Sequence, residues 1–237
     1  IGAPAEIGSR DWVTHGLLKE QLEGAAATRI CRDELWGAST TTSWHTWLPF
    51  VFDIQPLETI ELRTQALARL GAVPTFIDNE IDNLREGLRL GYSATRVTVE
   101  AVPDQVRSLI GPDSIFLGPA ARSDDPNFQS AVAQIYNEEI TPALIRYADF
   151  IENEYLSRAR ETLAVLGNPD GEACYPTLVR SFVTVAMPAA VIHAVGLEQV
   201  ASIREEIQVT LDEHFGGGDV SEFLRRVNED PAFTFDT

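Results

Sequence analysis

The longest helical pattern in this sequence runs from Pro126 to about Leu163. A straight helix over this range would be roughly 50 Å long. Pro142 lies inside the range, and because proline has no backbone N–H, it should bend the helix or divide it. A helix of this length needs neighbours along its whole length. The pattern therefore predicts an all-α fold, a multi-helix array with long kinked helices.

Shorter helical patterns lie on both sides of this segment. Ser9 can cap the first of them, Gly91 suits a left-handed C-terminal cap, and the glycines at 216–218 should end a helix. Pro56 and Pro74 each suit a first helical turn. The predicted helices are 9–28, 56–70, 74–90, 93–110 with an interruption at Pro103, 171–184, 188–214 and a short one through 228.

The segment 40–53 is the richest in aromatic residues. Because of Pro49, a regular helix is not expected beyond that residue, and the segment is expected to lie extended over the core or to line a cleft. His45 lies among these aromatic side chains and could face a ligand, although aromatic packing is the commoner fate of such a cluster. One hypothesis is therefore a helical ligand-binding module that uses residues 44–52.

Composition limits the classes of partner. The chain has 18 Lys and Arg against 36 Asp and Glu, a net charge of −18, which disfavours a nucleic-acid or anionic-membrane partner. Its 44% apolar content is enough for a substantial core, and no apolar run is long enough for a membrane span. Residues 111–127, rich in Gly, Pro, Asp and Ser, predict an irregular connection within a single helical domain or a segment of a larger one.

Cysteine and histidine spacing predicts no catalytic or metal-binding residue in this chain. Cys31 and Cys174 fit no metal-binding spacing; buried free thiols are the favoured interpretation, and a disulfide stays open as the alternative. No histidine lies four residues from another, so the His-Glu-x-x-His motif of zinc peptidases is missing from this sequence. No Glu-x-x-His pair of the di-iron type occurs either.

Three other side chains are candidates for binding. Arg96 is expected in the first helical turn after a Ser93 cap, where the helix dipole disfavours a cation; a carboxylate partner or a ligand anion is therefore expected. A surface ion pair is the simpler of the two alternatives. Tyr175 can reach a neighbouring cavity or anchor one helix to another. His193 lies among apolar residues, where a core or capping role is commoner than that of a ligand or base.

Several stretches of the sequence resemble one family along essentially the whole chain. That family is the bacterial proteins known as domain of unknown function 885, which look like zinc metallopeptidases of the gluzincin type. The stretches are Asn83–Gly91, Arg96–Glu100, Glu154–Leu156 with Ala159–Arg160, Tyr175–Arg180, Ile192–Val200 and Asp230–Thr237.

The resemblance implies that these residues are the N-terminal helical part of a larger metallopeptidase-like hydrolase. In the family, the metal motif is a His-Glu pair followed by Pro-Gly-His-His, and it lies beyond the segment that ends this sequence. Zinc is therefore expected in the full-length protein, with a wall and cap of the substrate cleft formed here. A peptide or amide-like substrate and the C-terminal part of the same chain are the implied partners. Arg96, Tyr175 and His193 are the implied substrate-binding residues.

The sequence departs from the family at Met187–Ala190, which replaces Thr-Pro-Glu-Glu and removes a capping hydroxyl and first-turn acids. It departs again at Ser181–Thr184, where the family often has a run of threonines.

The first residue, Ile1, indicates processing from a longer protein, and both the bacterial cytoplasm and export stay open. A scaffold domain is the third functional hypothesis.

Overall fold

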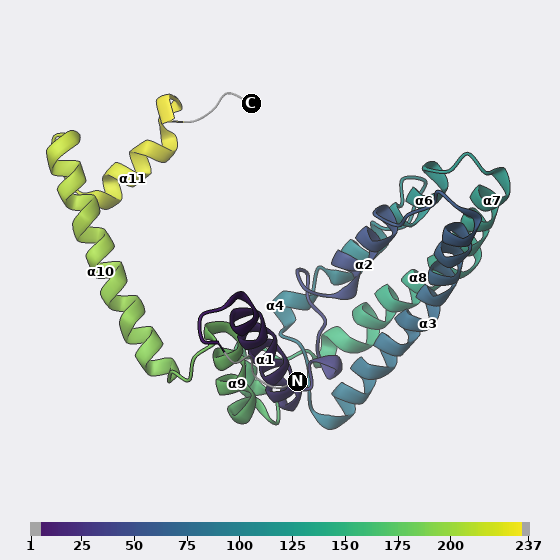
Figure 1. Cartoon of the computed structure of the whole chain (residues 1–237), viewed down its shortest axis with the longest axis horizontal. Helices are drawn as coiled ribbons and strands as arrows, with labels where there is room; N and C mark the ends of the chain where they lie inside the picture. Colours follow the sequence, from purple (N-terminus) through teal and green to yellow (C-terminus); the bar gives the residue numbers. More distant parts are fainter. Residues whose placement is uncertain (1–5, 234–237) are drawn as a thin grey trace. The chain divides into compact units, whose positions relative to one another are not determined.

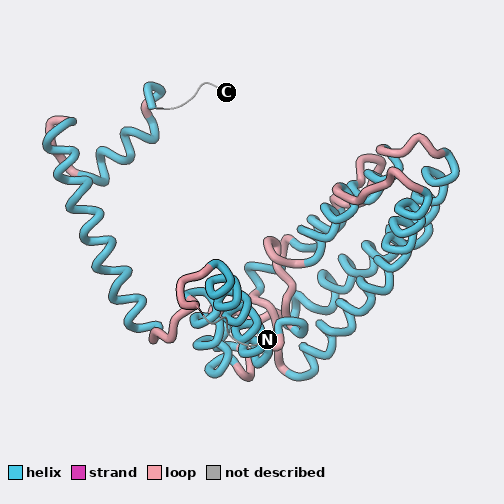
Figure 2. The backbone as a smooth tube through the Cα atoms, viewed as in Figure 1, coloured by secondary structure: helices cyan, strands magenta, loops and turns pink. Residues whose placement is uncertain are grey.

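Helices form the fold of this protein. The computed structural model describes residues 6–233, in which no strand occurs and an isolated β-bridge joins Thr95 to Arg160. The predicted all-α class is therefore confirmed. The helices are α1 (Arg10–Thr28), α2 (Trp44–Asp53), α3 (Ile60–Leu90), α4 (Arg96–Val99), α5 (Val102–Arg107), α6 (Gly118–Ala121), α7 (Pro126–Ile135), α8 (Thr141–Phe150), α9 (Gly171–Val183), α10 (Ala189–His214) and α11 (Val220–Glu229). Figure 1 labels most of them, and Figure 2 separates helices from loops.

The chain divides into two compact units, residues Ile1–Thr177 and Leu178–Thr237. The core of the first unit lies where α3 and α5 pack against α8, with α2 and α7 contributing further side chains (Figure 1). Leu70, Ile77 and Leu144 are among its fully buried residues. None of the helices in the described part of the chain is both long and apolar enough to cross a bilayer.

Helix α3 runs through Pro74 without a break. Separate helices at 56–70 and 74–90 were expected, and this expectation is wrong: one helix begins after the Thr59 cap and ends at Gly91. A proline inside a helix removes one hydrogen bond. Here Leu70, Val73 and Ile77 are buried around it, and this packing outweighs the lost bond.

The C-terminal end of α3 forms as the sequence predicts. Gly91 has a φ of 89°, in the left-handed region that favours glycine. The N–H of the next residue, Tyr92, donates to the Gly87 carbonyl at 2.8 Å, which satisfies one of the carbonyls left over at the helix end.

The long helical segment that begins at Pro126 is divided twice by π-helical turns, at Tyr136–Ile140 and at Ile151–Tyr155. Pro142 follows the first of these turns and lies in the first turn of α8, where its missing N–H is not needed. The predicted bend or division at Pro142 takes the form of a π-helical turn directly before it, and the helical backbone continues through this turn into α8. Helical structure ends with a 3₁₀ turn at Leu156–Arg158, slightly before the predicted end.

Helix α2 contradicts the expectation for the aromatic segment. It continues as a helix from Trp44 to Asp53, with Pro49 buried inside it. A proline in the second turn removes only one bond, and burial of Trp44 and Phe52 in the core compensates for it. The predicted helix 93–110 is interrupted as expected, into α4 and α5.

The connection at 111–127 is not wholly irregular. It contains a 3₁₀ turn at Ile115–Leu117 and the four-residue helix α6. Asp125 then caps α7, because its side chain accepts hydrogen bonds from the backbone N–H groups of Asn127 and Phe128.

Helix α1 forms where it was predicted, and the Ser9 side chain accepts from the Trp12 N–H at 3.2 Å. Its packing differs from that of a core helix. Gly24 is its only buried residue, whereas Trp12, Val13, Leu17, Leu18 and Leu22 are all exposed.

In the second unit, α10 and α11 agree with the predicted helices. The glycines 216, 217 and 218 all have positive φ and end α10. Asp219 then caps α11 by accepting from the Glu222 N–H at 2.9 Å. Leu211 is the only buried residue of α10.

Candidate functional site

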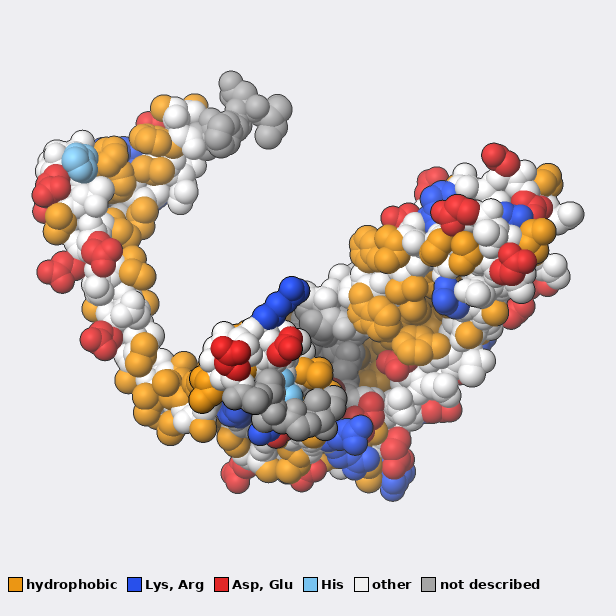
Figure 3. Space-filling model, in the orientation of Figure 1, with side chains coloured by type: hydrophobic (Ala, Val, Ile, Leu, Met, Phe, Trp, Pro, Cys, Tyr) orange, Lys and Arg blue, Asp and Glu red, His pale blue; other side chains and the backbone are white. Residues whose placement is uncertain are grey.

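The outer face of α2 carries four apolar side chains that are exposed: Trp47, Phe50, Val51 and Ile54. Their spacing of three, four and seven residues places them on one side of the helix. Trp47 is 50% exposed and Phe50 is 60% exposed, which is unusual for side chains of this size. This aromatic stripe is a candidate binding surface, and Figure 3 shows apolar side chains exposed over this part of the first unit.

The inner face of α2 is part of the core. Trp44 meets Tyr147 edge-to-face, with ring centroids 5.1 Å apart. His45 is buried, and its Nε2 lies 2.9 Å from Oε1 of Gln105, so Nε2–H is the donor. Burial lowers the pKa of His45, which keeps the imidazole neutral. A neutral histidine that faces the core packs the helix in place and does not present a base to a ligand.

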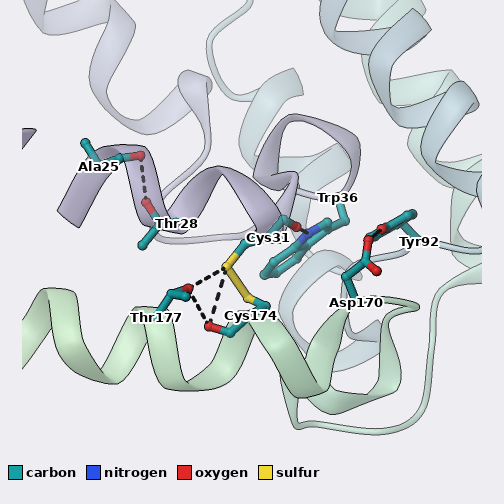
Figure 4. Close-up of a disulfide and its surroundings, with 8 residues drawn as sticks. All are labelled: Ala25, Thr28, Cys31, Trp36, Tyr92, Asp170, Cys174 and Thr177. Carbon is teal, nitrogen blue, oxygen red and sulfur yellow. Dashed lines mark hydrogen bonds between the residues drawn. A yellow bond between two sulfur atoms is a disulfide. The ribbon is translucent and has the colours of Figure 1, made fainter. Parts of the chain in front are cut away.

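The two cysteines form a disulfide, with their Cα atoms 4.8 Å apart. The favoured interpretation of buried free thiols is therefore wrong. The cysteines are buried as expected, but their proximity is produced by the fold, which brings the end of α1 beside the start of α9 (Figure 4).

Arg96 has the carboxylate partner that its position predicts. Its Nε donates to Oε1 of Glu161 at 2.5 Å, and both side chains are more than one third exposed. The backbone N–H of Arg96 donates to the Arg160 carbonyl at 2.8 Å. The helix cap is Thr95 instead of the predicted Ser93. Exposed pairs of this kind contribute less than about 1 kcal/mol, so the guanidinium can exchange its partner at low cost.

Tyr175 and His193 are both exposed. Tyr175 lies on α9 directly after Cys174, in the first unit, and His193 lies near the start of α10, in the second. Arg96 and Tyr175 both belong to the first unit, and among the described residues no hydrogen bond, ion pair or ring contact joins their two side chains. The substrate-binding role predicted for these three residues stays a prediction.

Surface hollows on the first unit include two that are lined by charged side chains. One, of about 480 Å³, lies between α3 and the α8 segment; the other, of about 550 Å³, lies beside the loop before α7. In the first, Arg146 binds Asp78 and Arg85 binds Glu154, each through two guanidinium nitrogens. These arginines are thus already paired with the walls of the hollow. Neither hollow includes Arg96, Tyr175 or His193.

The described residues contain no candidate metal-binding site. Within residues 6–233, no three His, Cys, Asp or Glu side chains are gathered so that they could hold a metal ion. The zinc that the family resemblance implies does not fit the residues present here, and no catalytic step is assigned to them.

A family model described as a bacterial protein of unknown function, DUF885, matches residues 3–237. None of the curated proteins matches the sequence.

A solved structure has the same fold. It is described as "the putative lipoprotein from Colwellia psychrerythraea", and it superposes with a TM-score of 0.74 at 18% sequence identity. The match covers 85% of this chain and 37% of that chain. The chain thus spans little more than a third of the relative's length, and at this identity the likeness concerns the fold alone.

Proposed function

Because the chain belongs to the bacterial family of unknown function DUF885, we propose that it is the N-terminal helical part of a zinc-dependent, peptidase-like hydrolase. In this proposal it forms a wall and cap of the substrate cleft. The metal site lies in a part of the polypeptide outside these 237 residues. The substrate is a peptide or a related amide.

The observation that carries the proposal is the apolar surface of α10. This 26-residue helix buries only Leu211. Val195, Val200 and Ile203 each expose about half of their surface, and Figure 3 shows apolar side chains along the helix. Most helices in proteins are stabilised by packing of an apolar face, and large exposed apolar patches mark interaction sites. The remaining part of the same polypeptide is the proposed partner, in keeping with the 37% coverage of the longer relative.

Support for the zinc-peptidase chemistry comes from the resemblance of the sequence stretches. Zinc in such an enzyme polarises the scissile carbonyl and activates water. We place Arg96, Tyr175 and His193 on the cleft wall. Arg96 is the best placed of them to bind a peptide carboxylate, because its present partner, Glu161, is highly exposed and easily exchanged.

A polypeptide extended beyond Thr237 tests this proposal. We expect stoichiometric zinc by elemental analysis and hydrolysis of peptides that chelation abolishes, because the zinc ligands are proposed to lie in the extension. The 237-residue chain is the control and is expected to hold no zinc. An extended protein without zinc, or one that cleaves no peptide, would contradict the proposal.

Two variants of the extended protein distinguish substrate binding by Arg96 from its ion pair with Glu161. Arg96→Ala should raise KM by about tenfold, the cost of losing one charge-assisted hydrogen bond. Glu161→Ala breaks the same ion pair but leaves the guanidinium available, so its KM should stay the same or fall. Equal changes in both variants would show that Arg96 does not contact the substrate.

The exposed aromatic stripe of α2 favours a second candidate function, a helical ligand-binding module. Trp47 is the tryptophan of this stripe and is 50% exposed, so binding of a ligand with apolar groups should change the tryptophan emission. We expect a peptide library to contain members that shift this emission in the wild type and in Trp36→Phe, but not in Trp47→Phe. Trp36 is the control because it is not part of the stripe and its indole N–H donates to the carbonyl of Cys31, a residue of the disulfide. Unchanged emission across the library would argue against this function.

A further inference from the structure

The Cys31–Cys174 disulfide joins two helices that are far apart in the sequence. Cys31 ends the 3₁₀ turn that follows α1, and Cys174 lies in the first turns of α9. The separation of 4.8 Å between their Cα atoms is within the range that a disulfide spans without backbone movement. Each residue exposes 2% or less of its surface. Once the protein is folded, reagents in solution therefore have little access to the sulfur atoms.

The surroundings hold both cysteines in place. The Trp36 indole N–H donates to the Cys31 carbonyl at 2.8 Å, and the Thr177 hydroxyl donates to the Cys174 carbonyl at 2.7 Å. The Arg160 guanidinium lies over the Trp36 ring, 5.6 Å from its centre. Figure 4 shows the sulfur–sulfur bond between the two chain segments, with Trp36 beside it.

Three segments of the chain meet at this point. Besides the two that carry the cysteines, the turn after α3 contributes Tyr92, whose hydroxyl donates to the Asp170 carboxylate. Gly171 is also required here: a Cβ at this position would lie 2.3 Å from the Val165 carbonyl oxygen. A site built this closely around a disulfide holds it as a structural crosslink. Since α1 buries no side chain of its own, the crosslink adds a second covalent attachment, beside the backbone, between the end of this segment and α9.

We propose that this disulfide is formed while the chain folds outside the bacterial cytoplasm, so that the protein is an exported one. Thiols of cytoplasmic proteins are kept reduced, whereas the periplasm and cell surface are oxidising. The oxidant belongs to the class of protein disulfides of that compartment. The thiolate of one cysteine attacks the oxidant disulfide and forms a mixed disulfide, and the thiolate of the other then displaces the oxidant as its dithiol. The two thiols lose two protons and two electrons, and the oxidant gains the electrons.

Trapping of thiols in the source bacterium tests the compartment. Cells are lysed in denaturant with an alkylating reagent, and the mass of the protein is measured in cytoplasmic and extracytoplasmic fractions. We expect the protein in the extracytoplasmic fraction with no alkylated cysteine, and with two after prior reduction. Protein that is found in the cytoplasm, or that carries two alkylated cysteines without reduction, would overturn the proposal.

Thermal unfolding tests the structural role independently. The Cys31→Ser, Cys174→Ser double variant should melt about 10 °C below the oxidised wild type. Reductant should lower the wild type to the same temperature once the disulfide is reduced in the unfolded chain, and should leave the variant unchanged. The same melting temperature for all four samples would show that the disulfide is not formed or has no structural role. Neither test depends on zinc or on peptidase activity.

Discussion

Gly87→Ala is expected to destabilise the protein by about 3 kcal/mol. An alanine Cβ at this position would lie 1.9 Å from the Leu35 carbonyl oxygen and 2.8 Å from its carbon, both backbone atoms. The backbone of α3 and that of the 3₁₀ turn Asp33–Leu35 would have to move apart. Urea denaturation followed by circular dichroism measures the loss as a lower unfolding midpoint.

The same helix contains a matched control. Gly71 lies in α3 with no atom within 4 Å of an added Cβ. Alanine has the higher helix propensity, so Gly71→Ala should stabilise the protein by about 0.5–1 kcal/mol. The two identical substitutions are therefore expected to have opposite signs. A stabilising Gly87→Ala would mean that the close approach of Leu35 to α3 does not exist.

Tyr155→Ala is expected to lower the free energy of unfolding by about 4 kcal/mol. Tyr155 lies in the second π-helical turn and is fully buried. Its hydroxyl accepts a hydrogen bond from the Ala94 N–H at 2.7 Å. The substitution leaves a cavity and also a buried backbone donor without a partner.

Tyr155→Phe separates these two contributions. It keeps the ring and removes the hydroxyl, so a loss of about 1–2 kcal/mol is expected. Burial raises the pKa of Tyr155 to about 12, so the hydroxyl stays protonated throughout the neutral range and both losses should be independent of pH there. Equal losses for the two variants, measured by urea denaturation, would contradict the importance of ring packing.

The parts of the fold that could be predicted from sequence are those decided within a few residues. Ser9 begins a helix and Gly91 ends one, through bonds to atoms at most five positions away. A cap of this kind needs only its own residue type and the helix beside it. The all-α class was also correctly predicted, because helical patterns occur along the whole sequence.

The errors arose where packing overrides local preference. Pro49 was expected to prevent a regular helix beyond it, and Pro74 was expected to begin a helix. Both lie inside helices whose neighbouring side chains are buried. A proline costs a helix about 3 kcal/mol, which burial of two or three large apolar side chains offsets. Sequence alone does not reveal which apolar residues around a proline will be buried.

Contacts between residues far apart in the sequence could not be predicted from local patterns. A carboxylate was one of the two partners expected for Arg96 from its place in a helix. The identity of this partner, Glu161, could not be predicted, because the two residues are 65 positions apart. The disulfide joins residues 143 positions apart. The close approach at Gly87 depends on Leu35, which belongs to a turn far away in sequence.

The disulfide also determines the covalent connectivity of the unfolded protein. Every residue of the core cluster, from Ala38 to Ala159, lies between Cys31 and Cys174 in the sequence. The oxidised unfolded chain is therefore a closed ring with two tails, and the ring contains all the residues that build this core. A protease that cuts one peptide bond of the ring opens it into a single, still connected molecule. A cut in either tail, in contrast, releases a separate fragment.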